Sequence, residues 1–338
     1  MSGERDGPPE PAARWQGLFQ LLDAHRRFLI TTHVHLDGDA IGAQVALALV
    51  LEELGKETLL VNDDPVPRIY RFLDPRERVR AYAPDRDEAD IAACDAAIVV
   101  DVGALDRIGR LGPALARLGV PLACIDHHAT NGGFARVNVV DSSASSTSAL
   151  VLDLIRALGQ RPGQAVAEAL FVGLATDTGW FRFANAGPPA FRDAAELVAC
   201  GASPPRLYEL IYEDLTWART RLLARTLATL RPDGDGRIAY ATITREMFEQ
   251  TGARDEEVEG FVDKLREVGG VEVVILFRER AQGGTRVSLR AKRDADVGAL
   301  AARFGGGGHR RAAGLILDEP LDRAVPRILA ATRELLGS

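Results

Sequence analysis

Four of the six histidines in this 338-residue chain lie in two short segments that also carry aspartates. A mixed set of carboxylate and imidazole side chains is the ligand chemistry of Mn²⁺ and similar divalent ions. Two more aspartates have related settings, one closing the apolar run AAIVV and one in the segment GLATDTGWF. The complete set is His33, His35, Asp37 and Asp39 in THVHLDGDAIG, Asp101 and Asp177, and Asp126, His127 and His128 in IDHHATN.

Short apolar runs precede most of these side chains. FLITT (28–32), AAIVVD (96–101) and VPLACID (120–126) predict buried strands, and each ends in or is followed by Asp or His. In an open α/β sheet, ligands bind outside the carboxyl ends of the strands. We therefore expect the three segments to bring their aspartates and histidines to one edge of a sheet, where Asp177 could join them.

Such a gathering of carboxylates requires cations, because four aspartates and two imidazoles carry too much negative charge to remain together unpaired. Two divalent ions would neutralise Asp37, Asp39, Asp101 and Asp177 almost completely. A pair of ions roughly 3.5–4 Å apart is the usual arrangement for phosphoryl hydrolysis, in which the ions activate a water and neutralise the phosphate. The candidate ligand set contains no cysteine, so a closed structural zinc site is not indicated.

Each feature taken singly has a structural explanation. Asp39 could cap the helix that follows it, a lone aspartate after a strand often forms a turn, and the pair His127–His128 could be an ordinary surface or core pair. The joint occurrence, with three of the segments at predicted strand ends, favours a functional site over these explanations.

The elements around the site predict two domains. Strands and helices alternate over residues 14–205, as in a mostly parallel α/β sheet, with a further strand at 57–62 and helices near 39–54, 145–158, 163–175 and 189–200. Residues 206–232 are expected to be a helical connector, continuous to about residue 230. Residues 233–338 predict a smaller α/β domain with three strands and helices near 255–268 and 320–336. We expect the active site in the cleft between the two domains.

The second domain has a chemical motif of its own, FGGGGHRRAAG. Glycines allow backbone N–H groups to approach an anion closely, although a glycine run is also typical of a flexible loop. With His309 next to it and Arg290 in the basic strand VSLRAK, the motif predicts a phosphate or nucleotide clamp made by Gly306, Gly307, Gly308, His309 and Arg290. Trp180, Phe181 and Arg182 could contact a base or sugar, with core packing an equal alternative.

The motifs resemble a known family in their order and spacing. HxxxDGDxxG, an aspartate closing an apolar strand, DHH, and an aspartate in a TDTG-like turn resemble the DHH phosphoesterases, and GGGGHRRAAG resembles the signature of their associated C-terminal domain. The resemblance extends from about residue 28 to 317. Within the family, the chain is similar to the bifunctional oligoribonuclease and pAp phosphatase branch, the nano-RNases.

That resemblance implies a role for most of the set. His33 and Asp37 would hold one ion. The other ion would be held by Asp39, His127 and Asp177. Asp101 would bridge the two ions and would be a catalytic residue. His128 would be catalytic and would face the scissile phosphate, and Asp126 would orient a ligating histidine. His35 is given no role.

The implied activity is Mn²⁺-dependent hydrolysis of short oligoribonucleotides, such as the dinucleotide pApA, of pAp, or of both. A RecJ-like exonuclease usually carries additional nucleic-acid-binding domains, and a family II pyrophosphatase has a different C-terminal domain. A cyclic-dinucleotide phosphodiesterase and a non-catalytic nucleotide-binding module remain alternatives. The latter is expected to have lost metal ligands, all of which are present here.

Composition limits the partners and the compartment. The net charge of −7 argues against binding along long nucleic acid, but it allows a small anionic substrate held by local groups. No charge-free run of 18 residues predicts a membrane span, and the polar, proline-rich start lacks the apolar core of a secretory signal. Three widely spaced cysteines predict free thiols in a reducing compartment, so we expect a cytoplasmic protein; a homodimer is left open.

Overall fold

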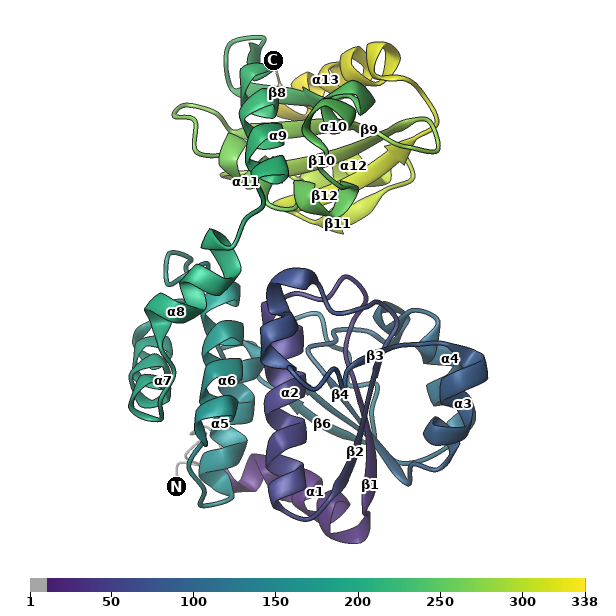
Figure 1. The fold of residues 1–338 in the computed structure, drawn as a ribbon, viewed down its shortest axis with the longest axis vertical. Coiled ribbons are helices and arrows are strands. Elements are labelled where there is room, and N and C mark those ends of the chain that lie inside the picture. The colour runs from purple at the N-terminus through teal and green to yellow at the C-terminus, as the bar shows by residue number, and fades with distance from the viewer. Residues whose placement is uncertain (1–10, 338) are drawn as a thin grey trace, which may run out of the picture. The chain divides into compact units, whose positions relative to one another are not determined.

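The computed structural model describes residues 11–337, without the side chains of Pro11, Ala12 and His309. It divides into two compact units between Asp214 and Leu215 (Figure 1). The boundary falls inside the segment that the sequence predicts to be a helical connector. Each unit contains a six-stranded sheet, and each is described separately.

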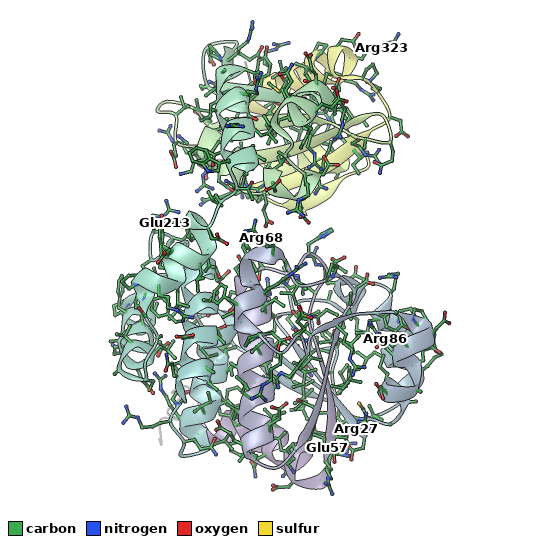
Figure 2. The ribbon with its side chains drawn as sticks, viewed as in Figure 1. Arg27, Glu57, Arg68, Arg86, Glu213 and Arg323 are labelled. Carbon is green, nitrogen blue, oxygen red and sulfur yellow. The ribbon has the colours of Figure 1, made fainter. Side chains whose placement is uncertain are left out.

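The sheet of the first unit is entirely parallel, as predicted. Its strand order reverses direction between β1 and β4, which is the switch point where open α/β sheets bind ligands. Arg27 and Glu57, which pair at the start of β1 and β2, mark the opposite edge of the sheet (Figure 2). In spatial order the strands are β3 (Arg80–Ala81), β2 (Glu57–Asn62), β1 (Arg27–Thr31), β4 (Ala96–Val100), β5 (Leu122–Asp126) and β6 (Val137–Val140).

Helices cover both faces of this sheet, which is why its strands are apolar on both sides. Phe28 and Ile30 pack with the helices of the larger layer, whereas Leu29 packs with those of the smaller one. The larger layer comprises α1 (Pro11–Ala24), α2 (Gly38–Glu53), α5 (Thr147–Ala157), α6 (Gln164–Asp177) and α7 (Pro188–Ala199); the smaller one comprises α3 (Pro84–Ala92) and α4 (Leu111–Leu118).

Helix α2 is buried on almost every side because it lies between the sheet and α6. The two helices approach so closely at Gly42 that a Cβ there would collide with the carbonyl oxygen of Ala169 on α6. The glycine of the HxxxDGDxxG motif at position 42 is therefore explained by helix packing. This packing brings the end of α6, with Asp177, to the start of α2.

The second unit has a mixed sheet with helices on both faces, which confirms the predicted second α/β domain. Among the strand pairs of the described residues in this unit, only β8–β9 is parallel. Helices α9 (Trp217–Ala228), α10 (Arg245–Thr251) and α11 (Phe261–Leu265) cover one face, and α12 (Val297–Ala302) and α13 (Leu321–Leu336) the other. The strand order is β11 (Gly307–His309), β12 (Ala312–Leu317), β10 (Thr285–Ala291), β9 (Val273–Glu279), β8 (Ile238–Ile243) and β7 (Arg231–Asp233).

Three local expectations differ from the structure. The continuous helix predicted for the connector is interrupted: α8 (Pro204–Tyr208) runs into a π-helical turn (Glu209–Glu213), and Thr216 caps a new helix by accepting a hydrogen bond from the Arg219 N–H. The helix expected at 255–268 is divided by Gly260, whose φ of +79° is left-handed. The glycine loop contains the short edge strand β11.

The cysteines and helix lengths add two observations. Cys94, Cys124 and Cys200 are free, and the first two are buried. Among residues 11–337, no helix is both long and apolar enough to cross a membrane.

Candidate metal centre and active site

The candidate residues lie at the carboxyl ends of β1, β4 and β5 and at the end of α6. Asp37 caps α2 by accepting hydrogen bonds from the N–H groups of Asp39 and Ala40, which places Asp39 in the first turn. Asp101 directly follows β4 with a left-handed φ of +59°, an unusual conformation for a residue other than glycine and one that often occurs at functional sites. His127 and His128 directly follow β5.

One group of side chains forms around His33. Its Nε2 lies 3.4 Å from Asp101 Oδ2 and 3.8 Å from Asp37 Oδ2. The ligand atoms of these three residues all lie within 4.8 Å of one another, close enough to share an ion. His33 Nδ1 is 2.7 Å from the carbonyl oxygen of Val34, which leaves Nε2 directed at the two carboxylates.

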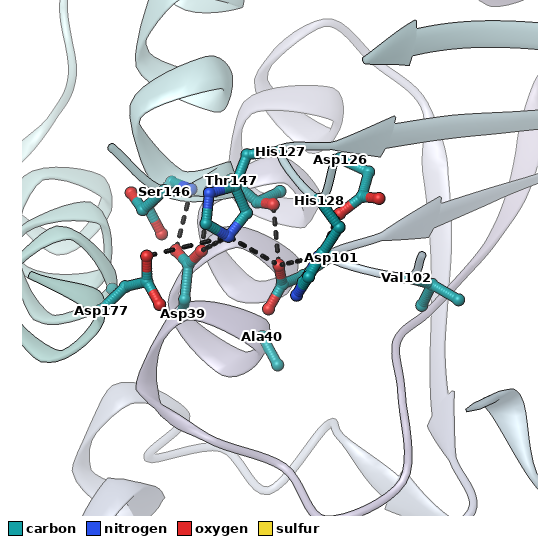
Figure 3. A network of polar contacts seen from close by, with 12 residues as sticks. Asp39, Ala40, Asp101, Val102, Asp126, His127, His128, Ser146, Thr147 and Asp177 are labelled. Atoms are coloured by element: carbon teal, nitrogen blue, oxygen red, sulfur yellow. Dashed lines mark hydrogen bonds and ion pairs between the residues drawn. The ribbon is translucent and has the colours of Figure 1, made fainter. Parts of the chain in front are cut away.

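A second group forms around His127 (Figure 3). Its Nε2 lies 3.6 Å from Asp101 Oδ1, 3.7 Å from Asp177 Oδ2 and 4.0 Å from Asp39 Oδ2. The ligand atoms of Asp39, His127 and Asp177 also lie within 4.8 Å of one another. The two oxygens of Asp101 therefore face different groups, Oδ2 toward His33 and Oδ1 toward His127.

His128 has a different environment from His127. Its Nδ1 lies 2.7 Å from Asp126 Oδ1 and 3.7 Å from Asp101 Oδ1. Asp126 is fully buried, and its other oxygen accepts a hydrogen bond from Asn131 Nδ2 at 2.8 Å. Asp126 was expected to orient a ligating histidine, but the histidine it contacts is His128, the one expected to face the phosphate. His128 also belongs to a third set of ligand atoms that lie within 4.8 Å of one another, together with Asp101 and His127.

Burial and mutual repulsion perturb the acids of the centre. Burial raises the pKa of Asp39 well above its usual value, and the charges of Asp101 and Asp177 raise it further. Burial, partly offset by His127, also raises the pKa of Asp177, to about 6. These carboxyl groups are held close together without enough positive charge to keep them ionised.

The histidine and the acid at the centre of the first group shift in the opposite sense. Burial lowers the pKa of His33, but the hydrogen bond and charge of Asp101 and the charge of Asp37 outweigh it and raise this pKa to about 9. Burial alone would raise the pKa of Asp101, whereas the neighbouring histidines, His33 foremost, lower it. A protonated His33 thus supplies part of the missing positive charge in the absence of a metal.

The donor set fits divalent cations. It combines carboxylate oxygens with imidazole nitrogens, lacks sulfur, and suits ions such as Mn²⁺. A cation would replace the protons that the raised pKa values of Asp39 and Asp177 indicate. The geometry therefore forms two adjoining groups of ligand atoms that share Asp101.

Comparison with known proteins identifies the family. The profile of the DHH family N-terminal domain matches residues 27–174, and that of the DHHA1 domain matches residues 235–338. A bifunctional oligoribonuclease and PAP phosphatase of Thermus thermophilus is 35% identical over 312 residues, 91% of this chain and 89% of that protein. The chain belongs to the DHH family of phosphoesterases.

Two further relatives of this DHH phosphoesterase cover nearly the whole chain. A bifunctional oligoribonuclease and PAP phosphatase of Bacillus subtilis is 25% identical and covers 88% of this chain and 91% of its own. The crystal structure of an exopolyphosphatase-related protein from Bacteroides fragilis superposes with a TM-score of 0.91 at 25% identity, covering 96% of this chain and 98% of the other. The predicted resemblance to DHH phosphoesterases is thus confirmed.

Sequence reasoning missed four residues that hold the acids of the DHH centre in place. The backbone N–H groups of Thr147 and Ser148 donate to Asp39, and the Thr147 hydroxyl donates to Asp101. Asn131 and Asn185 donate through their side-chain amides to Asp126 and Asp177. The run SSTS lies at the start of the helix expected near 145–158, but its acidic partners are more than 40 residues away and leave no local signal.

In the DHHA1 region, the predicted clamp residues lie at β11 and on β10, the two strands that flank β12. The backbone of His309 on β11 pairs with Ala312, which in turn pairs with Arg290 on β10. The His309 side chain lies outside the described part of the chain. Arg290 is half-buried, with its Nε 3.3 Å from Asp263 Oδ1. A Cβ at Gly306 or Gly308 would collide with β12, whereas Gly307 has open space around it.

The remaining sequence candidates have their contacts outside the two ligand groups. Trp180 packs against Phe171, Tyr208 and Tyr212, and Phe181 packs against Phe171, so the packing alternative describes both rings. Arg182 donates to the carbonyl oxygen of Gly179. The His35 side chain is 82% exposed and points to Asp64, 3.6 Å away, rather than to the carboxylate cluster.

Proposed function

We propose that this protein hydrolyses short oligoribonucleotides and pAp with two divalent ions, most simply Mn²⁺. His33 and Asp37 would hold one ion, Asp39, His127 and Asp177 the other, and Asp101 both. The observation that carries this proposal is the arrangement of Asp101, whose two oxygens each face a different group of ligand atoms. When bound, such ions neutralise the phosphate and lower the pKa of water for attack on phosphorus.

The chain's own residues would bind and orient the phosphate beside the ions. Asp126, by its hydrogen bond to Nδ1, raises the pKa of His128 above its usual value and so favours the protonated imidazole. With Nδ1 engaged, Nε2 is the atom free to donate to a phosphate oxygen or to the leaving oxygen. Asn131 holds Asp126 and Asp126 holds Nδ1, so the two residues fix the orientation of the His128 ring that would donate this proton.

The substrate class is inferred from the relatives and from the charge of the chain. Both bacterial relatives are named for oligoribonuclease and PAP phosphatase activity. A net charge of −7 offers little general attraction for a long polyanion, which favours small phosphorylated substrates. We assign catalysis to residues 14–205, connection to 206–232 and substrate binding to 233–338, where Arg290, Gly306, Gly307, Gly308 and His309 would hold a phosphate. We place the enzyme in the cytoplasm.

A substrate panel tests this proposal. Purified protein is incubated with Mn²⁺, Mg²⁺ or chelator and with pAp, pApA, cyclic dinucleotides, and RNA and DNA oligonucleotides of increasing length. We expect metal-dependent release of nucleotides from dinucleotides and of phosphate from pAp, at rates that fall as the chain lengthens. Processive degradation of long single strands at dinucleotide rates would instead favour a RecJ-like exonuclease, and tight nucleotide binding without turnover would favour a non-catalytic module.

The two adjacent histidines offer a second test. His127→Ala should weaken metal binding, measured by calorimetric titration with Mn²⁺, because Nε2 of His127 faces three carboxylates. His128→Ala should retain both ions and slow turnover at saturating substrate. Equal loss of metal in both variants would contradict this division of roles.

A further inference from the structure

The first turn of α5 contacts two of the candidate metal ligands. The Thr147 N–H donates to Asp39 Oδ2 at 2.7 Å and the Ser148 N–H donates to Asp39 Oδ1 at 2.9 Å. The Thr147 hydroxyl donates to Asp101 Oδ1 at 2.9 Å. All of these groups are buried, and Figure 3 shows Thr147 beside Asp39, Asp101 and His127.

These bonds restrict how each carboxylate can turn. A carboxylate oxygen has about two lone-pair sites, so each Asp39 oxygen keeps one for a cation while the other holds a helix N–H. The first turn of a helix also favours negative charge, which favours the ionised form of Asp39 that a cation would bind. The α5 backbone therefore fixes Asp39 in a single orientation.

Asp101 depends on a side chain instead. Its Oδ2 is within reach of His33, whereas its Oδ1 lies 3.6 Å from His127 Nε2 and receives the Thr147 hydroxyl. Among the described residues, Thr147 supplies the only side-chain hydroxyl bonded to Asp101, and it bonds the oxygen that faces the His127 group. Among the residues described, no lysine or arginine is paired with this carboxylate.

The Thr147 hydroxyl is not needed to cap the helix. Ser146 performs that role by accepting a hydrogen bond from the Ala149 N–H at 3.0 Å. Thr147 is fully buried, so its hydroxyl has no solvent to bond with if it leaves Asp101. The hydroxyl is therefore directed at the metal centre rather than at the end of the helix.

We propose that Thr147 is a positioning residue that holds Asp101 Oδ1 toward the His127 group and so sets the affinity for the ion held there. This inference rests on the proposed two-ion function. Its consequence is selective: loss of the hydroxyl weakens the ion held by Asp39, His127 and Asp177 and leaves the ion at His33 and Asp37 in place.

The test is Mn²⁺ binding to Thr147→Val, which keeps the volume and removes the hydroxyl, and to Thr147→Ser, which keeps the hydroxyl. Calorimetric titration should show one of the two ions bound about 10–100-fold more weakly in Thr147→Val, the usual effect of removing a group that orients a ligand. Thr147→Ser should restore the affinity. Asp177→Asn and Asp37→Asn identify the ion, because each belongs to one group only; Thr147→Val should resemble Asp177→Asn.

Two matched variants control for the buried helix start. Ser146→Ala removes the cap of α5 without touching Asp101, and Thr332→Val removes an equally buried hydroxyl, bonded to the carbonyl oxygen of Ile328, in the other unit. Both should bind two ions with normal affinity. Thermal unfolding reports folding, and Thr147→Ala replaces Thr147→Val if the latter does not fold.

Each outcome decides between the two levels of the proposal. Wild-type affinity for both ions in the hydroxyl-free variant, or equal weakening of both, overturns the role of Thr147 while the proposed function stands. Failure of the unmodified protein to bind two ions overturns the proposed function, and this inference with it.

Discussion

The charged groups at the candidate sites of the two units are balanced in opposite ways. At the edge of the first sheet, Asp37, Asp39, Asp101 and Asp177 have ion-pair contacts with histidines only, among the residues that the structure describes. In the second unit, Arg290 lies beside Asp263, and Arg278 and Arg245 share Asp255. The metal centre of the first unit thus lacks arginine or lysine partners among the described residues, whereas these arginines of the second unit already have carboxylate partners.

This difference separates two kinds of binding. A site with unbalanced buried carboxylates is destabilised until a cation arrives, so binding and folding stability are coupled. A site whose arginine already has a carboxylate partner gains less from a phosphate, because the ligand must compete with that partner. The first unit should therefore respond strongly to metal and pH, and the second should respond moderately to substitution.

The largest effect should come from Asp101→Asn. The change keeps the shape but removes the charge that both ligand groups share, so turnover of pApA should fall by more than about 100-fold, beyond the loss expected from an orienting group alone. Bound Mn²⁺, measured by elemental analysis, should fall as well, while circular dichroism remains normal. If the variant binds two ions and turns over pApA at the normal rate, Asp101 is not the shared ligand.

The next effect is on the stability of the metal-free protein. The pKa of His33 in the folded protein, about 9, exceeds its ordinary value of 6.5. Protonated His33 therefore stabilises the fold fully below pH 6.5, and this stabilisation is lost as the pH rises through 9. A shift of this size corresponds to roughly 3 kcal/mol in the free energy of unfolding. The pKa of Asp177 is raised to about 6, so this group also makes the free energy of unfolding fall as the pH rises, but over a lower pH range.

Urea unfolding with chelator at pH 6.5, 7.5 and 9 measures this loss. Saturating Mn²⁺ should reverse the trend, because the metal requires the deprotonated ligands. His33→Gln should flatten the metal-free profile. A metal-free stability that rises from pH 6.5 to 9 would contradict the charge imbalance of the first unit.

A smaller effect is expected in the second unit. Arg290→Ala should raise KM for pApA by about 10–100-fold, through loss of a charge-assisted phosphate contact worth roughly 1.5–3 kcal/mol, with metal content and kcat little changed. Asp263→Asn is the matched control, since it frees Arg290 from its partner and should lower KM. An unchanged KM in both variants would remove Arg290 from the substrate site.

The smallest effect concerns the glycines. Gly307→Ala meets open space, so it should leave the melting temperature unchanged and raise KM only a few-fold if the backbone there approaches a phosphate. Gly306→Ala should lower the melting temperature, because its Cβ would meet the backbone of β12. If Gly307→Ala changes neither quantity, the glycine run serves packing alone.

Much of the candidate centre could be predicted from the sequence. Apolar runs ending in Asp or His identified β1, β4 and β5, and the rule for parallel sheets brought their ends together. The helices α2, α6 and α7 were predicted to within a few residues because their apolar spacing is regular. The interruption of the connector before Thr216 was missed, since a single cap in a helical pattern is a weak signal.

The sequence by itself determined which side chains would gather at the edge of the first sheet, because strand ends are local patterns and parallel strands share their polarity. The division of Asp101 between the His33 and His127 groups was expected only from the family resemblance, not from the spacing of the residues. Only the tertiary structure decided that Asp126 contacts His128 rather than His127. It also decided that Thr147 would reach Asp101 and Asp39, 46 and 108 residues away. Such contacts depend on side-chain rotamers and on how α2, α5 and α6 pack, which no spacing along the chain encodes.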